Sequence, residues 1–158
     1  MEDYNEIKAQ ITKEANNYLE KFELKFSYGD NVDIVKKDWI GMYEYNSISF
    51  GTIVVYINDD ELIDAAFEED DLESDLRVTV FHEIGHAFME YVNELPDEVI
   101  EPYFKDFFDV FYDDNGVSEE DLCEDFGYSF DSEHYYLSDS SLLRELIEKM
   151  LRDGIKFS

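Results

Sequence analysis

The stretch VTVFHEIGHAFMEY, residues 78–91, contains two of the chain's three histidines, four positions apart, with a glutamate directly after the first. On a helix, residues four apart project from one face about one turn apart. His82 and His86 are therefore expected to place two imidazole nitrogens about 2 Å from a common metal ion. Glu83 is rotated by about 100° from His82 and still flanks that face. The pattern H-E-x-x-H thus predicts two metal ligands and a general base.

A buried structural helix that happens to carry two imidazoles is the alternative explanation of these residues. H-E-x-x-H arises by chance in only on the order of 1% of chains of this length and composition. Gly85 leaves room for another element to approach the helix closely. The helix also has a separate apolar face for core packing, so the histidines need not serve that purpose. This face is formed by Phe81, Ile84, Phe88, Tyr91 and Leu95.

A catalytic zinc site needs a third protein ligand and one open position. His134 is the only other histidine in the sequence, so a carboxylate is the obvious alternative ligand. Position favours the segment EEDLCEDFGYSF, residues 119–130, which lies downstream and has a helical pattern. Within this segment Glu124 lies 38 residues past His86. Cys123 could offer a sulfur ligand, but on a helix it points about 100° away from Glu124, so it is interpreted as core packing.

Hydrophobic periodicity divides the chain into three regions of one domain, residues 1–158. Apolar residues at steps of three and four predict an amphipathic helix over residues 2–25. Short β-type runs over residues 32–57 predict a small twisted sheet of three or four strands, of which Ile53–Ile57 is the clearest. Residues 60–153 have a helical pattern throughout. This order predicts an α+β fold, with the H-E-x-x-H helix and a third-ligand helix in the helical half.

Local signals predict where several of these elements begin and end. SYGDN at residues 27–31 is a turn signal, and Pro96 is expected to stop the H-E-x-x-H helix. Ser74 is a candidate N-cap for that helix, and Ser118-Glu119-Glu120-Asp121 is a plausible start, with acids in the first turn, for the helix that follows DDNG. The last helix is expected over residues 139–153, with basic residues in its final turn.

The composition excludes several classes of partner. A formal net charge of −29, from 41 acidic and 12 basic residues, repels nucleic-acid phosphates and anionic membranes and attracts cations. No run of about 18 apolar residues is present, and the polar start does not resemble a signal peptide. A single cysteine excludes an intrachain disulfide and fits a reducing compartment. We therefore predict a cytoplasmic protein that binds neither nucleic acid nor membrane.

H-E-I-G-H followed by E-D-F-G-Y-S-F resembles the gluzincin metallopeptidases, and within them the catalytic domain of anthrax lethal factor-like proteins. The resemblance covers roughly residues 50–150 and implies a zincin-like fold. The second family motif runs E-x-F-A-E-x-F, and its first glutamate is a zinc ligand. Glu124, Phe126 and Phe130 match this motif, so the resemblance implies that Glu124 is the third ligand. His134 also has a counterpart in the family.

The sequence departs from the family motif at two positions. Tyr128 stands where the family has a second glutamate, and Val117 stands where lethal factor has a tyrosine that can polarise the substrate carbonyl. The residue that stabilises the oxyanion is therefore left open. The candidates are Tyr112, Tyr128, His134, Tyr135 and Tyr136.

A second assignment of the third ligand, shifted by four residues, also fits the sequence. Glu120 and Glu124 have the E-x-x-x-[DE] spacing of thermolysin-like enzymes, in which Glu120 would bind the metal and Glu124 would support the site. We favour Glu124 as the ligand, because Phe126 and Phe130 then also match the lethal factor-like motif.

These inferences predict a zinc-dependent peptidase with His82, His86 and Glu124 as Zn²⁺ ligands. Glu83 is the expected general base toward a metal-bound water, and Tyr128 and His134 are further catalytic candidates. The expected substrate is a peptide or protein, with basic residues favoured by the acidic surface. If the strand near Ile53–Ile57 is the sheet edge beside the cleft, it would bind the peptide by strand addition.

Two other classes of function fit parts of the sequence. One is a zincin-like module that binds or regulates without cutting, which Tyr128 and Val117 motivate. The other is an acidic decoy that occupies a nucleic-acid-binding protein, which the charge motivates. A peptidase remains the leading hypothesis.

Overall fold

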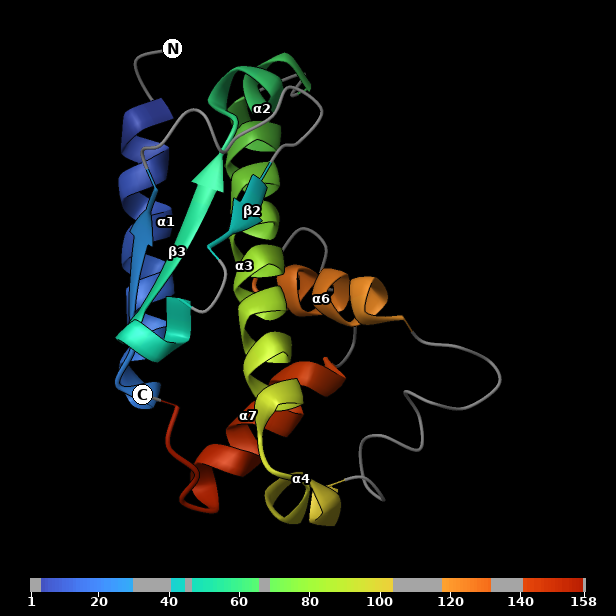
Figure 1. Ribbon diagram of the computed structural model, residues 1–158. Helices are drawn as coiled ribbons and strands as arrows, with labels where there is room; N and C mark the ends of the chain where they lie inside the picture. The colour runs from blue at the N-terminus through green and yellow to red at the C-terminus, as the bar shows by residue number, and fades with distance from the viewer. Residues whose placement is uncertain are drawn as a thin grey trace.

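The computed structural model describes residues 4–29, 41–44, 47–65, 69–103, 118–131 and 141–157. The N-terminal part contains α1 (Tyr4–Leu19), the 3-10 helix η1 (Glu20–Phe22), β1 (Lys25–Tyr28), β2 (Gly41–Tyr43), the 3-10 helix η2 (Ser47–Phe50) and β3 (Thr52–Ile57). The helical part contains α2 (Asp59–Ala65), α3 (Glu69–Glu94), α4 (Asp97–Tyr103), α6 (Glu119–Tyr128) and α7 (Leu142–Arg152). The fold is α+β, as predicted (Figure 1).

The described strands form one mixed sheet in the order β1-β3-β2. β1 pairs with β3 in parallel, with Phe26 opposite Ile53, and β2 pairs with β3 in antiparallel orientation, with Met42 opposite Tyr56. The strand prediction at Ile53–Ile57 is confirmed. It is wrong as a sheet edge, because β3 has a neighbour on both sides. The described edge that contacts α3 is β2.

The prediction of a helix over residues 2–25 extends too far. The helical backbone ends at Glu23, which adopts a left-handed conformation with φ of 60°. Lys25–Tyr28 then forms β1, so the predicted turn at residues 27–31 overlaps a strand. A strand of four residues is too short for its alternation to stand out beside the long amphipathic pattern of α1.

Several further bounds also differ from the predictions. Ser47–Phe50 is a 3-10 helix rather than part of a strand, and residues 32–40, where the predicted β-type runs begin, lie outside the described residues. Ser74 lies inside α3 rather than capping it, and its hydroxyl donates to Asp131. Pro96 follows the end of α3, as expected, and the predicted helix start at residues 118–121 is confirmed, with Ser118 as its N-cap.

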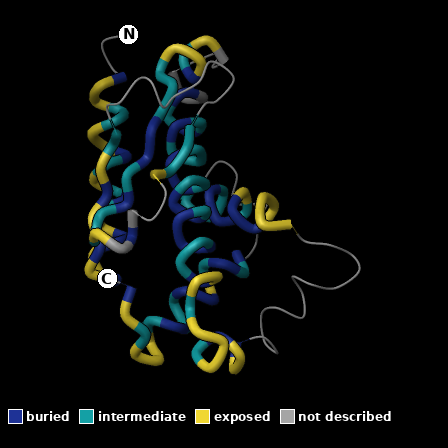
Figure 2. The backbone as a smooth tube through the Cα atoms, viewed as in Figure 1, coloured by how far each residue is buried: buried dark blue, intermediate teal, exposed yellow. Residues whose placement is uncertain are grey.

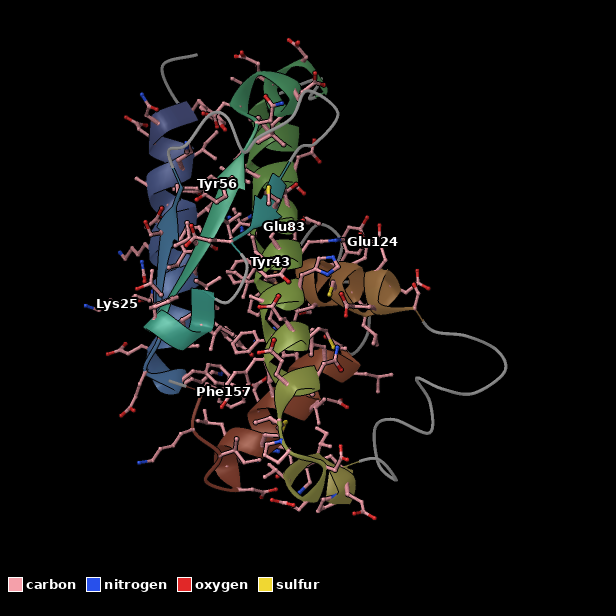
Figure 3. All side chains as sticks on the ribbon, in the orientation of Figure 1. Lys25, Tyr43, Tyr56, Glu83, Glu124 and Phe157 are labelled. Carbon is pink, nitrogen blue, oxygen red and sulfur yellow. The ribbon has the colours of Figure 1, made fainter. Side chains whose placement is uncertain are left out.

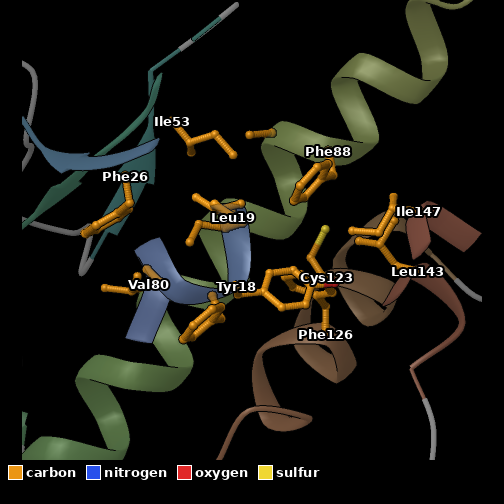
Figure 4. Packing of buried hydrophobic residues seen from close by; sticks show 14 of the residues in the cluster. Tyr18, Leu19, Phe26, Ile53, Val80, Phe88, Cys123, Phe126, Leu143 and Ile147 are labelled. Carbon is orange, nitrogen blue, oxygen red and sulfur yellow. The ribbon is translucent and has the colours of Figure 1, made fainter. Parts of the chain in front are cut away.

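α3 is the central element of the molecule, with the sheet on one side and α6 on the other (Figure 1). A stripe of buried residues repeated every four positions runs along most of this helix, and Figure 2 shows buried segments along α3. This stripe consists of Leu72, Leu76, Val80, Ile84 and Phe88. Figure 4 shows the aromatic part of the core, where Tyr18 of α1, Phe88 of α3 and Phe126 of α6 lie close together.

A network of hydrogen bonds and ion pairs connects three segments beside this core. Arg77 of α3 donates to Glu14 of α1 at 3.0 Å and to Asp131, just after α6, at 3.3 Å. The Asp131 side chain is only 1% exposed and also accepts from Ser74. A buried carboxylate needs such partners to offset its desolvation. The network therefore helps to fix α6 against α3. Within the described residues, no helix has the length and apolarity needed to cross a membrane.

Candidate metal centre

α3 places the imidazoles of His82 and His86 side by side, one helical turn apart. Their Nε2 atoms are 3.1 Å apart, and their ring planes are inclined by 52°. Both side chains are partly buried, with 17% and 15% exposure. Neighbouring residues on α3 face the core instead, since Phe81 and Ile84 are fully buried. The helix therefore separates a packing face from a face that presents two nitrogen donors, as the sequence predicts.

α6 brings the carboxylate of Glu120 to these two nitrogens. Glu120 Oε1 lies 2.7 Å from His82 Nε2, and Oε2 lies 3.1 Å from His86 Nε2. Among the described residues, His82, His86 and Glu120 form one group whose ligand atoms all lie within 4.8 Å of one another. The first turn of α6 is fixed by a capping box, in which Ser118 and Asp121 satisfy each other's backbone N–H groups.

The size and chemistry of this group fit a zinc ion. In a tetrahedral site with bonds of about 2.0–2.1 Å, neighbouring ligand atoms are about 3.3 Å apart. The two histidine Nε2 atoms, 3.1 Å apart, are close to that value, and one oxygen of the Glu120 carboxylate lies near each of them, so adjustment of these side chains would be enough to place three donors around one ion. Two imidazoles and one carboxylate are also a donor set used by catalytic zinc sites.

Glu124, which the family resemblance favours as third ligand, lies one turn further along α6. Its carboxylate accepts a hydrogen bond of 3.3 Å from the Tyr128 hydroxyl and is not part of the compact group. The geometry thus supports the second assignment, in which Glu120 rather than Glu124 lies at the two histidines. Figure 3 shows Glu124 on α6, farther from the sheet than Glu83 and Tyr43. The assignment of the ligand itself stays a prediction.

Glu83 is partly buried in the space between α3 and β2 (Figure 3). Burial raises the pKa of its carboxyl to about 7, and the nearby Glu120 carboxylate acts in the same direction. His86 and a hydrogen bond from the Tyr43 backbone N–H oppose this rise. A carboxyl group with a pKa near neutrality can accept and return a proton at physiological pH, which is the property that a general base requires.

The pKa of His82 is shifted downward from its ordinary value. Burial is the main cause, and His86 adds to it, whereas Glu120 and Glu124 act against it. A lowered pKa favours the neutral imidazole, which is the form that binds metal ions.

Two residues that the sequence did not single out also contact the site. The Tyr43 ring lies parallel to the His86 ring, with an angle of 9° and a centroid distance of 6.3 Å, and its hydroxyl donates to Glu90. Glu119 Oε2 lies 3.0 Å from His86 Nδ1. Glu119 directly precedes Glu120, and this adjacency is a signal that the sequence does offer. No comparable signal marks Tyr43, because its position depends on how the sheet docks on α3.

Two glycines allow α6 to approach α3 closely. A Cβ atom at Gly127 would lie 2.7 Å from the Val78 carbonyl oxygen and 3.2 Å from the His82 backbone nitrogen. A Cβ atom at Gly85 would lie 3.2 Å from the Phe126 ring. The expected role of Gly85 is therefore confirmed, and the close approach is what lets the first turn of α6 reach the histidines.

Of the other catalytic candidates, only Tyr128 lies in the described part of the chain, at the end of α6. Tyr112, His134, Tyr135 and Tyr136, as well as Val117, lie outside the described residues. The interpretation of Cys123 as core packing is confirmed, because its side chain is fully buried. Burial also raises the pKa of its thiol far above the ordinary value.

Searches of protein-family models, curated proteins and solved structures find no match to this chain.

Proposed function

We propose that the chain is a zinc-dependent peptidase with a zincin-like fold, in which His82, His86 and Glu120 hold the metal. The observation that supports this most directly is the compact group of two imidazoles and one carboxylate. Glu120 comes 38 residues after His82 and 34 after His86, so the fold brings two separate helices together at this point. When bound, zinc would act as a Lewis acid that lowers the pKa of water toward 7 and polarises a carbonyl.

Glu83 acts as the general base in this proposal. It takes a proton from the attacking water and gives it to the amine that leaves when the peptide bond breaks. Its pKa of about 7 in the metal-free protein and its position one residue from His82 support this role. The Tyr43 backbone N–H holds the carboxylate from the side of β2. Tyr128 and His134 stay the candidates for the group that stabilises the oxyanion.

The substrate is proposed to be a peptide that adds to the edge of β2 as a further strand. Support comes from the sheet order, which places β2 at an edge among the described strands, from the packing of β2 against α3, and from the contacts of Tyr43 with both His86 and Glu83. Strand addition satisfies the peptide backbone without demanding a particular sequence.

Basic side chains in the substrate are favoured by the charge around the site. α6 carries five acidic residues and no basic residue among its ten. The described lysines and arginines lie on α1, η1, β1, α3 and α7 and in the C-terminal segment. Salt should weaken a preference of this origin. A cytoplasmic location, predicted from the composition, would suit such a protein.

Zinc content and peptide cleavage together test this proposal. The purified protein should contain about one zinc per chain and cleave members of a lysine- and arginine-rich peptide pool. Glu83→Gln should keep zinc and lose cleavage, and His82→Ala should lose both. Wild-type protein that holds zinc but cleaves no peptide would favour the binding or regulatory module instead. Retention of zinc and cleavage by both variants would refute the proposed site.

A further inference from the structure

His86 is held at both ring nitrogens by consecutive residues of α6. Glu119 Oε2 lies 3.0 Å from Nδ1, and Glu120 Oε2 lies 3.1 Å from Nε2. Consecutive residues on a helix are rotated by about 100° from each other. The first turn of α6 therefore reaches around the imidazole, with one carboxylate on each of its two nitrogens.

The two carboxylates act on His86 in different ways. Nδ1 and Nε2 point in different directions from the ring, so the Glu119 oxygen at Nδ1 cannot bind the same ion that Nε2 would bind. A carboxylate at Nδ1 instead holds a proton on that nitrogen and leaves the Nε2 lone pair for a metal. It also adds negative charge next to the imidazole, which makes Nε2 a stronger donor.

The surroundings make this contact a stable one. The capping box of Ser118 and Asp121 fixes the turn that carries Glu119, and Gly127 allows the other end of the same helix to lie against α3. The face of the His86 ring lies parallel to Tyr43 of β2. The ring is thus oriented from three sides: by its own helix, by β2 and by the first turn of α6.

From this geometry we infer that Glu119 is a positioning residue, which fixes the orientation and tautomer of His86 so that Nε2 faces the metal. The inference rests on the proposed metal site, and it adds a role for a residue that does not bind the ion itself. Glu119 is half-exposed, so its loss should have little effect on folding. Its charged oxygen lies at Nδ1 of His86, so its loss should weaken metal binding.

The test measures zinc affinity by competition with a chromophoric chelator in wild type, Glu119→Gln, Glu119→Ala and the control Glu98→Gln. Loss of a partner that orients a metal-bound histidine typically costs about 10–100-fold in affinity. We expect a loss in that range for Glu119→Ala and a smaller one for Glu119→Gln, whose amide oxygen can still accept the Nδ1 proton. Glu98 is an exposed glutamate on α4, so Glu98→Gln removes the same charge and should change affinity less than about twofold.

A second readout reports on the hydrogen bond itself. In zinc-loaded protein with ¹⁵N-labelled histidine, the Nδ1 proton of His86 should exchange slowly in wild type and be lost to fast exchange in Glu119→Ala. Unchanged affinity and an unchanged Nδ1 proton in Glu119→Ala would overturn this inference while leaving the metal site intact. Failure of the wild-type protein to bind zinc would instead overturn the proposed function, and this inference with it.

Discussion

Gly127→Ala tests whether α6 lies on α3 as closely as the structure shows. The new Cβ atom would meet the Val78 carbonyl oxygen at 2.7 Å, well inside ordinary van der Waals contact, and the His82 backbone nitrogen at 3.2 Å. Both partners are backbone atoms of a long buried helix, so neither can turn away. Overpacking of this kind costs about 1–3 kcal/mol.

Helix propensity acts in the opposite direction, so the sign of the change in the free energy of unfolding distinguishes the two effects. Alanine in place of glycine inside a helix otherwise stabilises by about 1 kcal/mol. We therefore expect a net loss of up to about 2 kcal/mol in the free energy of unfolding, measured by urea denaturation followed by circular dichroism. Zinc affinity should fall as well, because a shift of α6 that relieves the clash would also move Glu120 relative to the histidines.

Gly85→Ala is the matched comparison on the facing helix. Its Cβ atom would meet the Phe126 ring at 3.2 Å, a milder contact with a side chain rather than with backbone. We expect a smaller effect on stability than for Gly127→Ala. A Gly127→Ala variant about 1 kcal/mol more stable than wild type would show that propensity acts unopposed, and would refute the close packing of the two helices.

The remaining predictions concern charge and pH. The folded pKa of Glu83, about 7, exceeds its ordinary value of 4.5, so ionisation of Glu83 destabilises the metal-free fold as the pH rises between those two values. Metal-free Glu83→Gln should thus be more stable than metal-free wild type at pH 8 by at most about 3 kcal/mol, and the difference should vanish near pH 4. Urea denaturation at the two pH values measures this difference. Equal stability of the two proteins at both pH values would refute the burial of this carboxyl. Arg77→Met removes a cation that pairs with the buried Asp131 and should cost about 3–5 kcal/mol, whereas Lys149→Met, which breaks an exposed pair with Asp153, should cost much less. A loss of equal size in these two variants would contradict the buried network.

The H-E-x-x-H helix was predictable because two independent patterns agree. The apolar residues of α3 repeat at helical spacing, and His82 and His86 fall on a different face of the same helix. The start of α6 was predictable for a similar reason, since Ser118 and Asp121 form a local capping motif that needs no distant partner.

The position of the third carboxylate was not predictable in the same way. Glu120 and Glu124 are four residues apart, so they lie on one face of α6 and differ only by a shift of about one turn along its axis. Which of them reaches the histidines depends on how far α6 slides along α3. Contacts at Gly85 and Gly127 set that position, and sequence spacing does not report it.

The sheet edge was misjudged for a related reason. Ile53–Ile57 has the strongest strand pattern because β3 pairs with a strand along each of its two edges and is largely buried, as a central strand is. Its parallel partner β1 has only four residues and follows directly on a helical segment. Strand pairing between residues so far apart in the chain is a tertiary property that a local pattern does not contain.

The proposed metal site is tested most directly by the zinc affinity of two matched variants, Glu120→Gln and Glu124→Gln. Each removes one negative charge from the same face of α6, so general electrostatics affect both alike. If Glu120 is the third ligand, Glu120→Gln should weaken zinc binding by more than the roughly 100-fold expected for loss of a hydrogen-bond partner, while Glu124→Gln should stay within about tenfold of wild type. Wild-type protein that binds no zinc, or a loss confined to Glu124→Gln, would contradict the proposed metal site.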